Sequence, residues 1–327
     1  MLSLTCATGP YDRTEALRDG RVRPEGIELT CLTLSPEEMF FRQLRYQEFD
    51  VSELSLSKYI MMRAAGDDRF IALPVFPSRS FRHRNIFVRA DRGIAQPRDL
   101  AGRRIGVPEY SMTAAVWVRG LLKDEYGVGA ADITWVQAGQ EQAGRAELAQ
   151  LDLSRYGIHL ETVADRSLSE MLVAGDIDAM ISAKEPSCYR RSPHVLRLIE
   201  DYRPVEEDYF RRTGVFPIMH CVVVRQSLYR QYPWMAQSLT KAFAAAKDMA
   251  QDRLRELGAL SAMLPWLPAE VARLDDVMGP DWWPYGIEPN LPALTTLLGY
   301  QAEQGLIKTL PVVEELFAPS TLRTFKV

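Results

Sequence analysis

Metal-binding residues are scarce in this sequence, which has four cysteines and four histidines among 327 residues. The cysteines are far apart, and no CxxC, HxxxH or HExxH spacing occurs. Structural zinc sites use closely spaced ligands, so we expect no such metal site, and whether a divalent metal assists the protein stays open. We interpret each cysteine as a reduced, buried, small apolar residue.

Several other motifs are also absent. Without GxGxxG or GxxxxGK[ST] there is no support for a nucleotide cofactor, and without GxSxG there is none for a serine nucleophile at a strand-to-helix turn. A net charge of −4 argues against nucleic acid as a partner. No uncharged stretch reaches the ~18 residues of a membrane helix, and the N-terminus lacks the features of an export signal. We therefore expect a cytoplasmic protein without nucleic-acid or membrane partners; the oligomeric state, a homo-oligomer included, stays open.

The residues that are present are typical of a globular α/β protein, with 47% hydrophobic and 25% charged residues. At roughly 100–200 residues per domain, this length indicates two domains. Strand and helix patterns alternate in the first third, and again from about residue 96. After residue 225 the pattern is almost wholly helical, with a long amphipathic helix near 235–250. The Gln-, Gly- and Ala-rich segment 139–155 is a candidate mobile insertion.

Two domain arrangements fit this pattern. The domains can be sequential, or the last segment can return to complete the first domain. Ligands of such sheets bind beyond the carboxyl ends of strands and in clefts between domains. The predicted strands cover residues 2–7, 26–34, 50–54, 70–75, 84–89, 105–107, 133–136, 158–163, 179–182, 195–199 and 218–225. Those at 84–89 and 218–225 bracket the middle segment, as crossing connections between domains would.

The densest charge cluster is at residues 78–92. It contains Arg79, Arg82 and Arg84 with a single acid, Asp91. Such a run is either a solvated face or an anion site. Because arginine binds carboxylates bidentately and aromatic residues lie between these arginines, the second interpretation predicts a small, planar, multiply anionic ligand.

A second candidate site is a predicted strand-to-helix turn at residues 108–114. Helix N-termini and their hydroxyl groups can bind a carboxylate, although a plain N-cap explains the same pattern. This turn contains Glu109, Tyr110, Ser111, Met112 and Thr113. Similar positions follow earlier strands, at Tyr11, Asp12 and Arg13 and at Glu53 and Ser55.

Two of the histidines lie at the predicted domain crossings. His83 is within the arginine cluster, and His220 is in the strand predicted at 218–225. A lone histidine is more often packed than catalytic, but imidazole is well suited to proton transfer near neutral pH. His159 and His194 have no such context. The aromatic run at 282–286 is interpreted as packing or a subunit contact, and ligand stacking stays open as an alternative.

Six segments together resemble the 4,5-dihydroxyphthalate decarboxylase family, over nearly the whole chain. They are YDRTEALRDGRVRPEGIEL, EFDVSELSLSKYIMMRAAGD, PVFPSRSFRHRNIFV, IGVPEYSMTAAVWVRGLL, RTGVFPIMH and DWWPYGIEPN. The resemblance implies a two-domain type II periplasmic-binding-protein-like fold with a ligand cleft between the domains. It implies a discontinuous domain of residues 1–90 and 220–327, and a second domain of residues 91–219.

The resemblance also implies decarboxylation of 4,5-dihydroxyphthalate, a small aromatic dicarboxylate, to protocatechuate without an organic cofactor. In this interpretation His83 and His220 are the proton-transfer candidates, with a slight preference for His83. Glu109 and Glu53 hold the hydroxyl groups or orient a histidine. Anchors for the substrate are Arg79, Arg82 and Arg84 with the turn at 110–113, and the candidates near the earlier strands are Asp12, Arg13 and Ser55.

Two other functions stay open at this point. The leading one is a solute-binding protein for an aromatic or other organic anion, because the same cleft and anchors would serve it. The other is a ligand-sensing regulatory module, which we do not expect because no DNA-binding segment precedes the α/β pattern.

Overall fold

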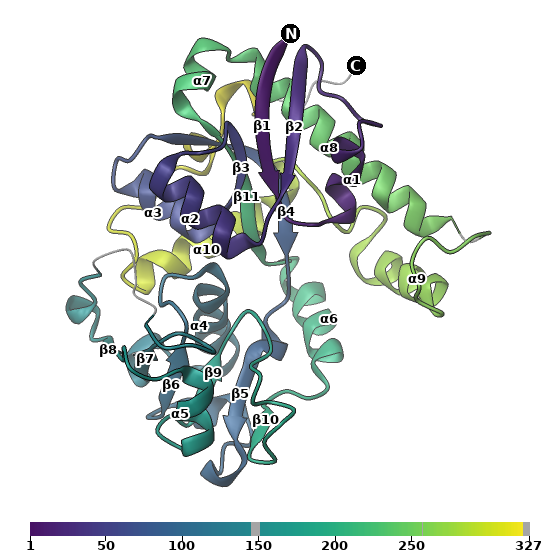
Figure 1. Cartoon of the computed structure of the whole chain (residues 1–327). Coiled ribbons are helices and arrows are strands. Elements are labelled where there is room, and N and C mark those ends of the chain that lie inside the picture. Colours follow the sequence, from purple (N-terminus) through teal and green to yellow (C-terminus); the bar gives the residue numbers. More distant parts are fainter. Residues whose placement is uncertain (145–150, 257, 323–327) are drawn as a thin grey trace. The chain divides into compact units, whose positions relative to one another are not determined.

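The computed structural model describes residues 1–144, 151–256 and 258–322 (Figure 1). The chain forms two compact units. Unit 1 contains Met1–Arg79, Phe210–Leu294 and Pro311–Val327, and unit 2 contains Ser80–Tyr209 and Thr295–Leu310. Each unit has its own β-sheet, so the predicted α/β class is confirmed. Residues 145–150 of the predicted insertion lie outside the described part of the chain.

Unit 1 is built on a five-stranded mixed sheet in the order β2-β1-β3-β11-β4. Strand β1 is parallel to β2 and β3, whereas β11 is antiparallel to β3 and β4. The strands are β1 (Leu2–Thr8), β2 (Ile27–Thr33), β3 (Val51–Ser55), β4 (Phe70–Arg79) and β11 (Ile218–Arg225). Its shorter helices are α1 (Glu15–Arg18), α2 (Pro36–Tyr46), α3 (Leu56–Ala64), α7 (Gln226–Gln231) and α9 (Leu267–Met278). The parallel strands β1 and β3 therefore end at the same edge of the sheet.

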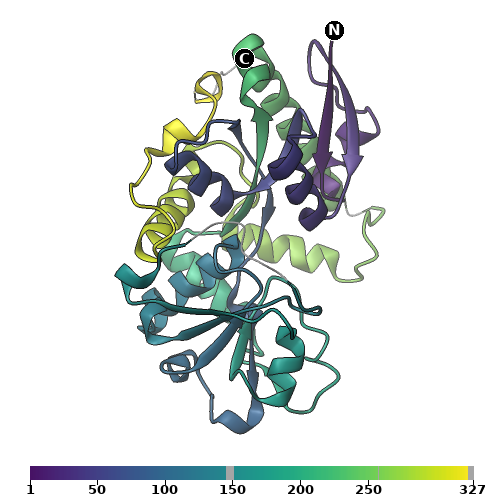
Figure 2. The ribbon, with the colours of Figure 1, turned by 60° about the vertical axis from the view of Figure 1, so that its left-hand side comes forward.

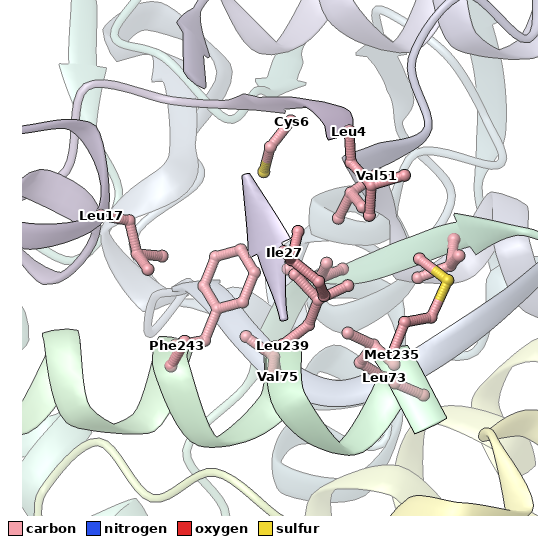
Figure 3. Close-up of a cluster of buried hydrophobic side chains, with 14 of the residues drawn as sticks. Leu4, Cys6, Leu17, Ile27, Val51, Leu73, Val75, Met235, Leu239 and Phe243 are labelled. Carbon is pink, nitrogen blue, oxygen red and sulfur yellow. The ribbon is translucent and has the colours of Figure 1, made fainter. Parts of the chain in front are cut away.

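The main core of unit 1 lies between this sheet and helix α8 (Trp234–Arg255). Met235, Leu239 and Phe243 recur at helical spacing and are fully buried. They pack with Leu73 and Val75 of β4 in one hydrophobic cluster (Figure 3). The amphipathic pattern predicted near 235–250 is thus confirmed as the helix that covers this sheet.

Unit 2 is built on a six-stranded sheet in the order β10-β5-β9-β6-β7-β8. Its strands are β5 (Ile86–Arg89), β6 (Arg104–Val107), β7 (Thr134–Gln137), β8 (His159–Thr162), β9 (Ala179–Ile181) and β10 (Val195–Arg197). The strands β6 to β9 pair in parallel, and β5 is antiparallel to β9 and β10. Figure 2 shows this sheet from a second direction.

Helices α4 (Thr113–Tyr126) and α5 (Leu168–Ala174) belong to unit 2. Local sequence defines both ends of α5. Ser167 and Glu170 form a reciprocal capping box at its start, and Gly175 adopts a left-handed conformation with φ of 87° at its end.

The N-terminal boundary of unit 2 differs from the predicted one. Residues 80–90 are assigned to the first domain by the sequence, but β5 pairs with β9 and β10 of the second sheet. Residues 210–219, which the prediction assigns to the second domain, lie in unit 1. The chain passes from unit 2 to unit 1 within helix α6 (Tyr202–Thr213).

A second difference concerns residues 295–310, which the prediction assigns to the first domain. They lie in unit 2 and include most of α10 (Leu291–Glu303). The Tyr300 hydroxyl donates a 2.6 Å hydrogen bond to Asp124, and its ring packs edge-on against Trp117 of α4. These tertiary contacts explain why a segment near the C-terminus joins the middle of the chain.

Strand β4 is also longer than predicted. The predicted strand ends at Val75, but Ser78 and Arg79 still pair with β11. Pro74 and Pro77 indicate a strand end in the sequence, yet β4 is an edge strand, where proline is tolerated. Arg79 therefore belongs to the sheet of unit 1.

Among the described residues, every helix is too short or too polar to cross a lipid bilayer.

Candidate functional site

The most distinctive polar group in unit 1 is a glutamate–histidine pair. Glu53 is in β3 and His220 is in the neighbouring strand β11, where His220 pairs in register with Ser55. The two side chains meet, with 2.5 Å between His220 Nδ1 and Glu53 Oε1. Phe40 of α2 packs edge-on against the imidazole, with ring centroids 4.9 Å apart.

Glu53 is completely buried and is the centre of a hydrogen-bond network. The Tyr11 hydroxyl donates to Oε1 at 2.8 Å, and the backbone N–H of Gly9 donates to Oε2 at 3.0 Å. Burial alone would raise the pKa of the Glu53 carboxyl, but the hydrogen bonds from His220, Gly9 and Tyr11 lower it below its ordinary value. Glu53 is therefore an ionised carboxylate inside the protein.

This network orients the imidazole of His220. A carboxylate only accepts hydrogen bonds, so the Nδ1 atom that faces Glu53 must bear a proton. Nε2 is then the ring atom available to a ligand, and the side chain of His220 is 17% exposed. Such an arrangement can hold and transfer a proton.

Tyr11, Asp12 and Arg13 follow strand β1 next to Glu53. Burial raises the pKa of Tyr11, and so does the charge of Glu53, so that the phenol stays protonated. Arg13 lies 4.1 Å above the Tyr11 ring, and its Nε donates to the carbonyl of Pro77. Asp12 is exposed and forms a 3.1 Å ion pair with Arg13. Tyr11 and Arg13 thus belong to the surroundings of Glu53, whereas Asp12 contacts Arg13 at the surface.

Ser55 has a structural role in this arrangement. It is the N-cap of α3, and its hydroxyl accepts a 3.5 Å hydrogen bond from the N–H of Lys58.

Arg79 is a buried cation in the same unit. Its guanidinium donates to the side-chain oxygen of Asn290 and to the carbonyl of Pro284, and it lies 5.1 Å from the ring centroid of Phe216. Burial lowers the pKa of Arg79 to about 9. No carboxylate in the described ranges forms an ion pair with it, so its charge is available for an anion. A buried cation of this kind suits a carboxylate ligand.

His83 has a different environment, in unit 2. Its ring is 3% exposed, packs against Tyr209 and lies 3.8 Å from a carboxylate oxygen of Glu206. Neither ring nitrogen has a hydrogen-bond partner within the described chain. His83 is thus nearly inaccessible to solvent, whereas His220 is partly exposed and held by a carboxylate.

Arg82 and Arg84 are also in unit 2. Arg82 is buried and donates to Asn85 and to the carbonyl of Ala183. Burial and the neighbouring charge of Arg84 lower the pKa of Arg82 to about 10. Arg84 lines a cavity of about 510 Å³ whose other charged residues are Lys184, Glu185, Arg190 and Arg197. With four basic residues and one acid, this cavity is suited to an anion.

The turn before α4 differs from the predicted helix start. The helix begins at Thr113 with Met112 as N-cap, so Ser111 precedes the cap, and the Met112 side chain makes no capping hydrogen bond. The N–H of Met112 donates to the carbonyl of Glu109, which forms a turn ahead of the helix. Tyr110 donates its N–H to Gln137, and its ring packs against Arg119 at 3.8 Å. All of these residues except Met112 are buried.

The structure therefore divides the predicted site residues between the two units. Unit 1 contains Asp12, Arg13, Glu53, Ser55, Arg79 and His220, and unit 2 contains Arg82, His83, Arg84 and residues 109–113. The sequence reasoning identified Tyr11 with Asp12 and Arg13 as a candidate after the first strand, but not as a partner of Glu53. It also missed the buried hydroxyl of Tyr285, which the aromatic run at 282–286 contains.

Comparison with known proteins identifies one relative that matches along the whole chain and a second that matches 64% of it. The 4,5-dihydroxyphthalate decarboxylase of Comamonas testosteroni is 42% identical over 100% of this chain and 99% of the relative. The enzyme of the same name from Pseudomonas putida is 44% identical over 64% of this chain and 82% of its own length. The family model described as NMT1/THI5 like matches residues 81–154.

Solved structures show the same fold at low sequence identity. The periplasmic aliphatic sulphonate binding protein of Escherichia coli is 13% identical, with a TM-score of 0.56 over 98% of this chain and 99% of that protein. The desulfurization enzyme DSZB is 18% identical, with a TM-score of 0.52 over 98% of both chains. The fold is thus the two-domain fold of periplasmic solute-binding proteins, as predicted. From its similarity to the two curated relatives, the chain belongs to the 4,5-dihydroxyphthalate decarboxylase family.

Proposed function

We propose that this protein decarboxylates 4,5-dihydroxyphthalate to protocatechuate and CO₂, without an organic cofactor. Membership of the decarboxylase family supports this function over that of a solute-binding protein. The observation that carries the proposal in the site itself is the buried Glu53 carboxylate bonded to His220. A binding protein needs anchors for its ligand, whereas decarboxylation of an arene also needs a proton donor.

The substrate sets the chemical requirements. Each carboxylate of 4,5-dihydroxyphthalate is para to a hydroxyl group. When that hydroxyl is deprotonated, its electrons can move into the ring, and the carbon that bears the carboxylate can accept a proton. The C–C bond to the carboxylate then breaks, its electrons restore the aromatic ring, and CO₂ leaves. The net reaction consumes one proton.

We assign this proton to Nε2 of His220. The Nδ1–H of the same ring stays bonded to the ionised Glu53, which stabilises the positive charge of the imidazolium before transfer. Tyr11 and Gly9 hold Glu53 in place through their hydrogen bonds. After transfer, the imidazole takes up a new proton from solvent through Nε2. A positioned acid of this kind typically contributes about 10²–10⁴-fold to the rate.

Arg79 is the proposed anchor for the carboxylate that stays on the ring. Its guanidinium is buried, and its hydrogen bonds are to the neutral oxygens of Asn290 and Pro284. The basic cavity that includes Arg84 is a second anion-binding candidate, in unit 2. We propose Arg82 as a second candidate for substrate binding, and His83 and Glu109 as second candidates for proton transfer.

The proposal is tested by incubating the purified protein with 4,5-dihydroxyphthalate, with and without a chelator. CO₂ release and protocatechuate formation are followed directly. Phthalate, which has no hydroxyl groups, is the matched control and is expected to release no CO₂. Binding of 4,5-dihydroxyphthalate without product would refute the proposal in favour of a solute-binding protein.

A further inference from the structure

The segment from residue 281 to 290 is fixed against strand β4 of unit 1. Trp283 donates its indole N–H to the carbonyl of Phe76 at 2.9 Å, and the N–H of Gly286 donates to the carbonyl of Pro74 at 2.8 Å. Gly286 has a φ of 91°, a conformation that favours glycine. Tyr285, between these two contacts, is therefore held in a defined position.

The hydroxyl of Tyr285 is buried and has no hydrogen-bond partner in the described part of the chain. Its ring packs against the hydrophobic core beneath α8. Buried polar atoms are nearly always paired in native proteins, because an unpaired one loses its hydration without compensation. The hydroxyl is thus a donor that the fold itself does not use.

The two residues before Tyr285 contact residues of the candidate site. The residue before it, Pro284, accepts a hydrogen bond from Arg79 through its carbonyl. Trp283 lies under the guanidinium of Arg13 at 4.3 Å, and the same guanidinium covers Tyr11, the partner of Glu53. Burial raises the pKa of Tyr285; Arg13 and Arg79 oppose this shift, and Glu53 and Asp12 add to it. The phenol is therefore a neutral donor at physiological pH.

We propose that the Tyr285 hydroxyl donates a hydrogen bond to the substrate carboxylate that Arg79 binds. This inference rests on the proposed function and adds to it a specific recognition group. Arg79 bonds to the carbonyl of Pro284, the residue before Tyr285, so one carboxylate with two oxygens could accept hydrogen bonds from both side chains.

The test is the Tyr285→Phe variant, with Tyr229→Phe as the matched control because Tyr229 packs against the same core. Loss of one hydrogen bond to a charged group predicts a KM for 4,5-dihydroxyphthalate about 10- to 100-fold higher. The kcat should stay within roughly threefold, since the contact is made equally in the ground state and the transition state. The control should leave both constants unchanged.

Stability separates this role from a structural one. Removal of an unpaired buried hydroxyl should leave the thermal unfolding temperature of Tyr285→Phe unchanged or raise it. A lower unfolding temperature with normal KM would show a role in the fold and overturn the inference. An unchanged KM in a stable variant would overturn it as well.

The same variants distinguish this inference from the proposed function. If the wild-type protein binds 4,5-dihydroxyphthalate in calorimetry but releases no CO₂, the proposed function fails. The inference then still predicts a Kd about 10- to 100-fold higher for Tyr285→Phe. If the wild-type protein neither binds nor converts this compound, both are wrong.

Discussion

Replacement of His220 by Gln is the sharpest perturbation of the proposed site. Glutamine can still place an amide near Glu53, but it cannot deliver a proton from the position of Nε2. Glu53 keeps two of its three hydrogen bonds in this variant, from Tyr11 and Gly9. We therefore expect the fold and the anchoring by Arg79 to persist.

The expected effect is a loss of kcat by about 10²–10⁴-fold, with KM within a few-fold of the wild-type value. This corresponds to about 3–5 kcal/mol in the activation free energy, at 1.36 kcal/mol for each factor of ten. Glu53→Gln should lower kcat through the same group, because a neutral amide no longer stabilises an imidazolium 2.5 Å away. The double variant should then be little worse than His220→Gln alone, since the two residues act as one unit.

The assay is steady-state formation of protocatechuate by the four proteins of this cycle. His194→Gln is the control, because His194 is exposed and belongs to unit 2, whereas Glu53 and His220 are in unit 1. A kcat of His220→Gln close to the wild-type value, or losses that simply multiply in the double variant, would refute the proton-transfer role of this pair. His83→Gln, measured alongside, would then be the next variant to interpret.

Three further predictions concern single residues. Arg79→Gln should raise KM by at least about tenfold, because loss of a charged partner of a bound carboxylate costs about 2–5 kcal/mol. In the folded state the pKa of Glu53 is below its ordinary value of 4.5. The ionised Glu53 carboxylate therefore makes its full contribution to the free energy of unfolding above pH 4.5, and this contribution is lost as the pH falls through the lower pKa of the folded state. Urea unfolding should therefore show a smaller loss of stability on acidification for Glu53→Gln than for the wild type. Cys31 should react with a thiol reagent before the three buried cysteines, since its hydrogen bond with Cys6 and the charge of Arg18 lower its thiol pKa against the effect of burial.

Much of the fold could be predicted because its patterns are local. Alternating strands and helices identified both sheets, and spacing at i, i+4 and i+8 identified α8. The segment 295–310 was misplaced because its unit is decided by the Tyr300–Asp124 hydrogen bond and the packing of Tyr300 on Trp117. Such contacts join residues about 180 positions apart and leave no periodic signal.

The candidate site was predictable in its residue types and less so in its geometry. The sequence identified Glu53 and His220 separately, but their contact depends on the register of β3 against β11, with His220 opposite Ser55. The preference for His83 rested on neighbouring arginines in the sequence. In the structure its nearest carboxylate is that of Glu206, 123 positions further along, and its ring is buried against Tyr209.

Charge movement during decarboxylation explains why a cation and a proton donor need separate positions. The departing carboxylate loses its negative charge as CO₂ forms, so a strong cation beside it would stabilise the substrate more than the transition state. Arg79 can therefore assist only when it holds the carboxylate that stays on the ring. The proton that we assign to His220 is instead added to the ring carbon before this bond breaks, and the electrons of the bond then restore the aromatic ring. In the proposed mechanism, the buried carboxylate of Glu53 holds this acid, His220, in position over the ring.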